Sequence, residues 1–311
     1  MNQPTIAFLG PRGTFSEAAL RAMPQSSDAE LVAMGSVTEA LAAVRAGAVT
    51  MALVPIESSS EGQVSTTLDE LALGEPLCII DEYAHPVRFA LLVRPGTPLE
   101  SVRRVATHPA AEAQCRLWLH ENLGDHVILP ATSTAGAAAS LTSDAPYDAA
   151  IAPAVAAEYY GLEILADDIG DAEGAATRFV LVTLPAPPPA PTGTDKTSLV
   201  LFMRENHSGA LLEILTELAV RGVNLTRIES RPIKRALGDY FFVVDAEGHV
   251  LDPRLGEAMA GLHRVCSSIR YLGSYPRHDG RAPQTEAWTE NAEFLSAGVW
   301  LERLRATGIA D

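Results

Sequence analysis

The sequence predicts an α/β fold in two domains: a two-lobed N-terminal region with a cleft, and a smaller C-terminal domain with the order βαββαβ. Three observations indicate this architecture. Short apolar runs alternate with Ala-rich helical patterns up to residue 183, a proline-rich stretch follows at residues 185–191, and the order of strands and helices changes after it. At 311 residues the chain also exceeds a typical single core, so more than one domain is expected.

The N-terminal region is predicted to alternate strands with helices. Its short apolar strand candidates are Ile6 to Leu9, Glu30 to Met34, Met51 to Pro55, Ala149 to Ala152 and Phe179 to Thr183. Two longer candidates, Cys78 to Ala84 and Val87 to Arg94, lie near the middle of the region. We interpret them as a crossover between two α/β lobes, which would leave a cleft between the lobes.

Three helix starts in this region have recognisable chemistry. Ser36 and Glu39 have the spacing of a capping box, Pro109 suits a first helical position, and Ser133 precedes an Ala-rich run.

The proline-rich stretch marks the domain boundary, because proline interrupts both strands and helices. The elements expected after it are Ser198 to Met203 (strand), Gly209 to Val220 (helix), Asn224 to Arg231 (strand), Asp239 to Asp245 (strand), Pro253 to His263 (helix) and Ser268 to Leu272 (strand). This order is that of a ferredoxin-like domain. We therefore expect domains at 1–184 and 196–275, a linker at 185–195, and a tail at 276–311 whose helix packs or contacts a partner.

Composition excludes several classes of protein. The formal net charge is −16, and nucleic-acid binding needs clustered cations, so no nucleic-acid partner is expected. No segment reaches about 18 uninterrupted apolar residues, so no membrane partner is expected either. The residues before Ile6 contain no basic stretch and no apolar signal core, which predicts a cytoplasmic protein.

The three cysteines, Cys78, Cys115 and Cys266, are far apart and form no metal-ligand pattern. They are expected to be small buried apolar residues. A nucleophilic role for Cys115, which lies near His108 and His120 in the sequence, stays open as an alternative. Since no nucleotide-binding glycine motif occurs, neither a metal nor an organic cofactor is expected.

Two loops between a strand and a helix are rich in glycine and hydroxyl residues, at residues 10–17 and 55–62. Both place backbone N–H groups at helix N-termini, which favour anions, so they are candidate sites for a small carboxylate. The alternative is that their hydroxyls only cap helices. A third segment, Ala176 to Phe179, sets the Thr177 hydroxyl beside the Arg178 guanidinium. Adjacent strand residues point to opposite faces, so these two side chains share a pocket only if the backbone there is a loop.

Four segments together resemble the prephenate dehydratase family: GPRGTFSEAA at the start, PIESSSEGQVSTTLDEL near residue 60, THPAAEAQC at 107–115 and ATRFVLV at 176–182. GAL at 209–211 and ESRP at 229–232 resemble the regulatory ACT domain. The resemblance implies two α/β lobes like those of type II periplasmic binding proteins, and conversion of prephenate to phenylpyruvate, carbon dioxide and water without a cofactor. It implies Thr177 and Arg178 as catalytic residues. The substrate-binding residues that it implies are Thr14, Glu57, Ser58, Ser59, Gly62, Thr67 and Phe179.

The ACT resemblance further implies feedback control by L-phenylalanine, bound where paired ACT domains of a homodimer or homotetramer meet. The implied effector contacts are Asn206, Gly209, Ala210, Leu211, Glu229, Ser230 and Arg231. Three positions depart from the family pattern: Ser58 and Gly174 stand where Asn is usual, and Ser208 stands where Pro is common. An arogenate dehydratase and a non-catalytic aromatic amino-acid sensor therefore remain alternatives.

Overall fold

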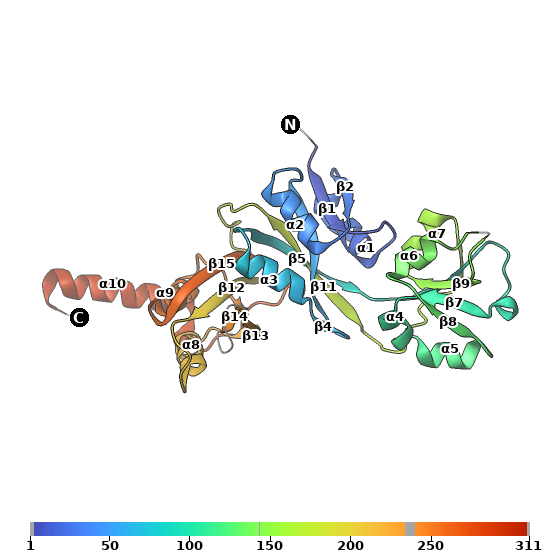
Figure 1. Ribbon diagram of the computed structural model, residues 1–311. Helices are drawn as coiled ribbons and strands as arrows, with labels where there is room; N and C mark the ends of the chain where they lie inside the picture. Colours follow the sequence, from blue (N-terminus) through green and yellow to red (C-terminus); the bar gives the residue numbers. More distant parts are fainter. Residues whose placement is uncertain (1–2, 143, 234–239, 310–311) are drawn as a thin grey trace. The chain divides into compact units, whose positions relative to one another are not determined.

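The chain forms two compact units (Figure 1). The computed structural model describes residues 3–142, 144–233 and 240–309. Unit one contains the residues up to Thr67 together with Tyr83–Val182, and unit two contains Leu68–Glu82 together with the chain from Thr183 onward. The division in space therefore differs from the one expected along the chain, because Leu68–Glu82 packs with the C-terminal unit.

The first sheet has the strand order β2-β1-β3-β11-β5, with the short strand β4 beside β3. Its strands are β1 (Thr5–Leu9), β2 (Glu30–Met34), β3 (Met51–Ser58), β4 (Gly62–Gln63), β5 (Cys78–Pro86) and β11 (Ala176–Thr183). β1 pairs in parallel with both β2 and β3, and helices α1 (Phe15–Ala22) and α2 (Val37–Arg45) connect these strands. The predicted cap of α2 is present: the Ser36 hydroxyl accepts from the Glu39 amide at 3.1 Å.

The second sheet has the order β10-β6-β9-β7-β8. Its strands are β6 (Ala90–Val93), β7 (Arg104–Thr107), β8 (Val127–Pro130), β9 (Ala149–Ala152) and β10 (Glu163–Ala166), and its helices are α4 (Pro109–Ala113), α5 (Arg116–Asn122), α6 (Thr134–Ala139) and α7 (Val155–Tyr160). Every residue of β9 is fully buried, as its uninterrupted apolar sequence predicts. Short 3-10 turns lie at Pro24–Ser26 and Leu99–Ser101.

The chain passes from the first sheet to the second between β5 and β6, and returns between β10 and β11. The predicted crossover is therefore confirmed, although its second strand begins at Ala90 and not at Val87. The returning segment was not predicted. The two crossing segments are hydrogen-bonded to each other, because the Val87 amide donates to the Ala175 carbonyl at 2.7 Å.

Unit two contains a four-stranded antiparallel sheet with the order β13-β14-β12-β15. Its elements are β12 (Asp195–Met203), α8 (Ala210–Ala219), β13 (Leu225–Pro232), β14 (Tyr240–Glu247), α9 (Pro253–Val265) and β15 (Cys266–Pro276). The predicted βαββαβ order is confirmed; Asp239, the expected first residue of the third strand, lies outside the described residues. Leu199, Val244 and Leu262 are fully buried in the core between sheet and helices.

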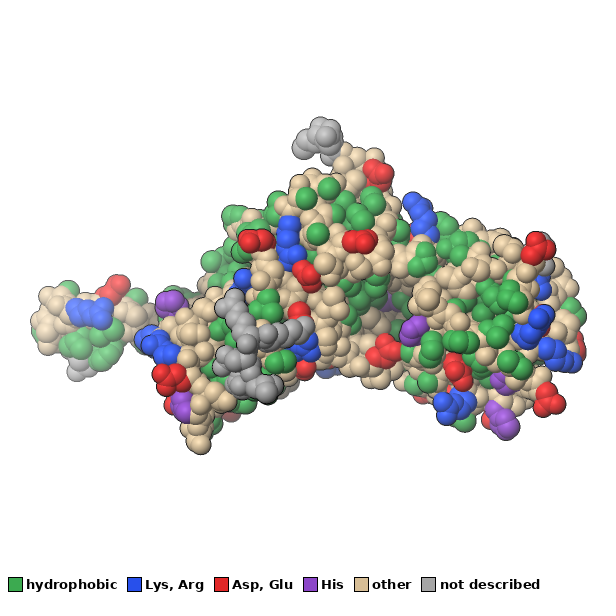
Figure 2. Space-filling model, in the orientation of Figure 1, with side chains coloured by type: hydrophobic (Ala, Val, Ile, Leu, Met, Phe, Trp, Pro, Cys, Tyr) green, Lys and Arg blue, Asp and Glu red, His purple; other side chains and the backbone are tan. Residues whose placement is uncertain are grey.

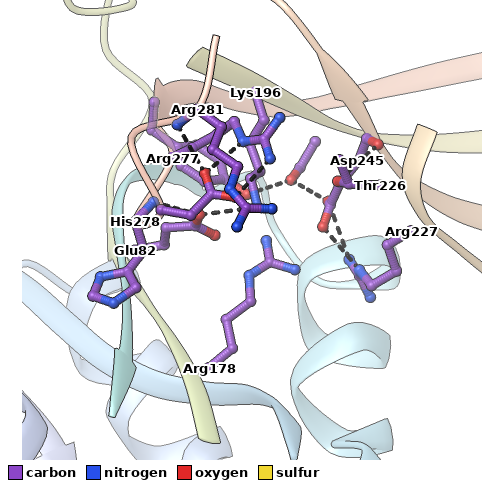
Figure 3. A network of polar contacts seen from close by, with 12 residues as sticks. Glu82, Arg178, Lys196, Thr226, Arg227, Asp245, Arg277, His278 and Arg281 are labelled. Atoms are coloured by element: carbon purple, nitrogen blue, oxygen red, sulfur yellow. Dashed lines mark hydrogen bonds and ion pairs between the residues drawn. The ribbon is translucent and has the colours of Figure 1, made fainter. Parts of the chain in front are cut away.

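Several buried charges of unit two form ion pairs with one another (Figure 3). Asp245 has no exposed surface, and it accepts from Arg227 Nε at 2.9 Å and from the Ser198 hydroxyl at 2.5 Å. Lys196 Nζ lies 2.9 Å from Glu82 Oε1, which also accepts from the His278 amide. Removing one partner from such a pair would leave an uncompensated buried charge, so these contacts fix the arrangement of the strands that carry them.

The tail contains a 3-10 turn at Ala287–Thr289 and the expected helix, α10 (Asn291–Thr307). Several large apolar side chains of α10 are exposed, among them Leu295, Val299 and Trp300. No helix within the described ranges combines the length and the apolar character that crossing a membrane requires.

Candidate active site and regulatory segments

A cleft of about 280 Å³ lies between the two sheets of unit one, and the space-filling surface is hollowed there (Figure 2). This volume is just below the usual range for small-molecule sites, about 300–1,000 Å³, and therefore suits a small metabolite. The residues that line it are Phe15, Ser58, Ser60, Glu61, Val87, Phe89, His108, Ala110, Ala111, Gln114, Thr132, Ser133, Thr134 and Thr177.

Thr177 lies in this cleft, at the start of β11. Its side chain is partly buried, and among the described residues its hydroxyl has no hydrogen-bond partner. A hydroxyl without an internal partner that faces a cleft is available to a ligand. The predicted catalytic role of Thr177 stays a prediction, and the structure places its side chain at the cleft.

Arg178 does not line the cleft with Thr177. The two residues follow each other within a regular strand, so their side chains point to opposite faces of the sheet. Arg178 Nη1 lies 3.5 Å from Glu57 Oε2, and the Arg178 side chain is only 13% exposed. The structure therefore shows Arg178 in an ion pair between β11 and β3, and its predicted contact with a substrate carboxylate stays a prediction.

The turn that follows β3 closes one wall of the cleft. The Ser58 hydroxyl accepts from the amides of Ser60 and Glu61, both at 3.3 Å. Ser59 forms two hydrogen bonds with Ala176: its amide donates to the Ala176 carbonyl at 2.9 Å, and its hydroxyl accepts from the Ala176 amide at 3.0 Å. Because Ala176 directly precedes Thr177, these bonds fix Thr177 relative to the turn.

Of the seven predicted substrate ligands only Ser58 is among the residues that line the cleft; Glu57 and Ser59 lie beside it, and the other four have structural roles. The Thr14 hydroxyl donates to the Leu9 carbonyl and caps α1, and the fully buried Thr67 hydroxyl donates to the Pro55 carbonyl at 2.6 Å. Phe179 is 2% exposed and belongs to the core. Gly62 has a φ of 78°, which is the backbone conformation that glycine favours, in the turn that leads to β4. The two threonine hydroxyls, the Phe179 ring and the backbone conformation of Gly62 thus support the strands and turns on which the cleft is built.

Gly174, where the family usually has Asn, has a φ of 74° and open space around its α-carbon. Gly and Asn are the residues that occupy this left-handed backbone region most readily. The substitution therefore preserves the turn before β11 and removes only the side-chain amide.

The sequence reasoning missed the wall of the cleft that the second sheet supplies. His108 caps α4, since its Nδ1 accepts from the Ala110 amide at 3.2 Å, and Nε2 is then the donor of the neutral ring. Gln114 Oε1 accepts from the Ser60 hydroxyl at 2.9 Å and so joins the two lobes across the cleft. The signal for this wall was present in the THPAAEAQC segment, where Pro109 predicted the helix start but the polar residues beside it were not assigned.

The floor of the cleft is apolar. Phe15, Val87 and Phe89 line it, and the rings of Phe15 and Phe89 meet edge to face with centroids 5.4 Å apart. His85 lies behind Phe15, with ring centroids 6.2 Å apart. Burial lowers the pKa of the His85 imidazole below its usual value, so this ring is neutral near pH 7 and adds no fixed charge to the floor.

The surroundings of Cys115 argue against the nucleophilic alternative, and the residue does not line the cleft. Its side chain has no exposed surface, and burial, followed by the field of Asp171, raises the pKa of the thiol to about 12. Cys78 and Cys266 are also buried, as expected. In the described part of the chain, no group of three or more His, Cys, Asp or Glu side chains is arranged to hold a metal ion.

The predicted effector residues lie on two elements of unit two. Ala210 begins α8 and lines a cavity of about 180 Å³, and Gly209 before it has a φ of 93°. Asn206 lies in the same turn and Leu211 on the first turn of α8. Glu229, Ser230 and Arg231 lie on β13 at the edge of the sheet, and none of them lines that cavity. Within one chain, therefore, the two motifs do not form a single pocket.

Arg231 is joined to helix α3 (Ser65–Leu73), which follows the cleft turn in the sequence. Arg231 Nη2 lies 2.8 Å from Asp69 Oδ1, and both side chains are mostly buried. Arg270 on β15 donates to the carbonyls of Leu71 and Gly74 at the end of the same helix. Gly273 lies so close to Ile79 that a β-carbon there would overlap the Ile79 carbonyl oxygen. The regulatory sheet thus holds α3 and the start of β5 tightly.

Comparison with known proteins agrees with this geometry. The family model described as prephenate dehydratase matches residues 6–186, and that of the ACT domain matches residues 197–264. Prephenate dehydratase of Mycolicibacterium vanbaalenii is 46% identical over 315 residues, which cover 97% of this chain and 98% of that protein. The structure of prephenate dehydratase from Arthrobacter aurescens in complex with L-Phe has a TM-score of 0.92 and 48% identity, over 97% of this chain and 99% of that one.

A structure described as GqqA, a novel type of quorum quenching acylase, also matches, with a TM-score of 0.77 and 33% identity over 88% of this chain and 97% of that one. The family model spans more than half of this chain, and the relative from M. vanbaalenii aligns along nearly all of it. The chain therefore belongs to the prephenate dehydratase family.

Proposed function

We propose that this chain converts prephenate to phenylpyruvate in the cleft of unit one and is regulated by L-phenylalanine through its ACT domain. The observation that carries the proposal is the Thr177 hydroxyl, which faces an apolar-floored cleft and has no other partner within the described ranges. In the reaction the ring C–O bond breaks, and the hydroxyl leaves with a proton as water. The ring carboxylate leaves as carbon dioxide, and the electron pair of its C–C bond completes the aromatic ring.

Thr177 is positioned to donate a hydrogen bond to the departing hydroxyl. A threonine is a weak acid, but a fixed donor stabilises the charge that develops on the leaving oxygen. The apolar floor formed by Phe15, Val87 and Phe89 acts on the other leaving group. It withholds water from the ring carboxylate, and a poorly solvated carboxylate loses carbon dioxide more readily.

The polar lining of the cleft consists of hydroxyl groups together with His108, Gln114 and the carboxylate of Glu61, and no Arg or Lys is among the described lining residues. Thr132, Ser133 and Thr134 supply hydroxyls from the second lobe, and the Ser133 hydroxyl also accepts from the Gly136 amide at 2.9 Å. The Ser60 hydroxyl of the first lobe donates to Gln114 Oε1 of the second lobe and so links the two lobes. In this arrangement Arg178 is a positioning residue, which holds β11 against Glu57 so that Thr177 keeps its orientation.

Membership of the family does not by itself fix the reaction, because one of its structural relatives is described as an acylase. The cleft favours dehydration over acyl transfer, because no cysteine is among its described lining residues and the Nδ1 atom of His108 already caps a helix. Acyl transfer requires an activated nucleophile beside a free base.

We infer that L-phenylalanine binds where a second copy of the chain completes the pocket beside α8. The two effector motifs are separate within one chain, and a partner's β13 would supply the missing half. Arg231 then has two roles, because it lies in the effector motif and pairs with Asp69 on α3. Ligand binding that disturbs this pair changes the support of α3, which begins three residues after Gly62.

Replacing Thr177 with Val removes the hydroxyl and keeps the shape of the side chain. We expect kcat for phenylpyruvate formation to fall by about 10²- to 10⁴-fold, because a positioned donor is lost. Thr177→Ser, the matched control, should keep most of the activity. The absorbance of phenylpyruvate in alkali measures the turnover of both variants with prephenate. Arogenate is supplied as a second substrate in a parallel assay. Turnover of Thr177→Val close to that of the unaltered protein would remove Thr177 from the mechanism.

Glu57→Gln and Arg178→Leu test whether Arg178 acts through its ion pair. If it positions β11, both variants should lower kcat by a similar factor, on the order of 10-fold, with KM nearly unchanged. A substrate-binding Arg178 would instead raise KM in Arg178→Leu alone. Steady-state kinetics with prephenate separates the two results, and the second one would restore the direct contact that the sequence predicted.

Asp69→Asn tests the link between effector and cleft. We expect L-phenylalanine to bind with nearly unchanged affinity but to alter kcat/KM several-fold less than in the unaltered protein, since coupling energies are typically about 1–3 kcal/mol and depend on such contacts. Calorimetry gives the affinity and an activity titration gives the coupling. Asp28→Asn, an exposed acid in a loop, is the control. Full regulation in Asp69→Asn would contradict the role of this pair.

A further inference from the structure

A second polar cavity, of about 230 Å³, lies in unit two. The start of β12, the loop after β14, the first turn of α9 and the segment before α10 surround it. It shares no lining residue with the cavity beside α8. Neither the dehydration chemistry nor the effector motifs make use of it.

Arg254 is the unusual residue of this cavity. It is 3% exposed, and its guanidinium makes one hydrogen bond, from Nη1 to the Gly222 carbonyl at 3.3 Å. Nε is buried without an acceptor, and no carboxylate lies within ion-pair distance among the residues that the structure describes. Burial lowers the pKa of this guanidinium below its ordinary value, against the opposing fields of Asp252 and Glu247. A buried guanidinium whose Nε has no acceptor and which has no direct ion pair is costly, and an anionic ligand would supply both contacts.

The wall around Arg254 is acidic, which argues against a simple anion. Asp252 accepts from the His249 amide through Oδ2 at 2.7 Å, and its other oxygen has no hydrogen bond within the described ranges. Glu290 is exposed at the rim. The Asp195 carboxylate, by contrast, is already occupied by Thr192 and the Gly193 amide. The cavity therefore offers one unsatisfied cation and two available carboxylates.

We propose that this cavity binds a small zwitterionic α-amino acid. Its carboxylate accepts from Arg254, and its ammonium group donates to Asp252 and Glu290, so that both signs of charge are matched. The Asn291 amide oxygen already accepts from the Arg254 backbone amide at 3.2 Å, which fixes α10 to the rim of the site. The apolar lining is limited to Ala282 and Pro283, so the ligand has a short side chain and no aromatic ring.

Calorimetric titration of the full-length protein with four probes tests the proposal. Glycine and L-alanine carry both charges, acetate carries the carboxylate alone, and ethylamine carries the ammonium alone. We expect glycine and L-alanine to bind at least about tenfold more tightly than either single-charge probe. Equal binding of acetate and glycine would overturn the zwitterion assignment, and absence of glycine and L-alanine binding up to about 10 mM would overturn the site.

Variants locate the binding in this cavity. Glu290→Gln, on the exposed rim, should keep the fold and lower the affinity for glycine about tenfold. Glu286→Gln replaces an exposed acid outside the lining and should leave the affinity for glycine unchanged. Arg254→Lys should abolish binding of glycine if the variant folds. Unchanged glycine affinity in Glu290→Gln would show that the ligand lies elsewhere, for instance beside α8. None of these outcomes depends on prephenate turnover, so failure here is distinct from failure of the proposed function.

Discussion

The two hydrogen bonds between Ser59 and Ala176 constrain the whole cleft. They join the turn after β3 to the first residue of the strand that returns from the second lobe. Both strands belong to the first sheet, so the bonds fix β11 beside the turn, and Thr177 is presented from a regular strand and not from a loop. Strand geometry then decides the rest: if Thr177 faces the cleft, Arg178 must face away, and it needs Glu57 as its partner.

Much of the fold was readable from the sequence because it depends on local chemistry. β2 and β9 have the predicted bounds, and the caps at Ser36 and Ser133 are present. Such features can be predicted because an apolar run or a capping hydroxyl depends only on residues a few positions away. What could not be read is the grouping of Leu68–Glu82 with the C-terminal unit. That grouping depends on long-range partners, such as Lys196 for Glu82, which no local pattern reveals.

The site was predicted in part, for a related reason. A hydroxyl that caps a helix and a hydroxyl that binds a ligand look alike in a sequence, so Thr14 and Thr67 were grouped with Ser58 although their oxygens hold neighbouring carbonyls. His108 and Gln114 were missed because their position depends on how the second sheet folds back toward the first. The separation of Thr177 and Arg178 could be anticipated from one rule alone, which is that side chains alternate between the two faces of a strand.

The grouping of Leu68–Glu82 with the regulatory sheet has a consequence for dissecting the protein. A fragment that ends at the proline-rich stretch includes the whole family match at 6–186 but lacks every residue that pairs with α3 and β5 from the C-terminal side. Glu82, 5% exposed in the whole chain, would lose Lys196, and Asp69 would lose Arg231. The catalytic part of this chain is thus not a detachable module. If regulatory domains are exchanged between relatives, the residues of α3 that contact the regulatory sheet have to be exchanged together with the domain.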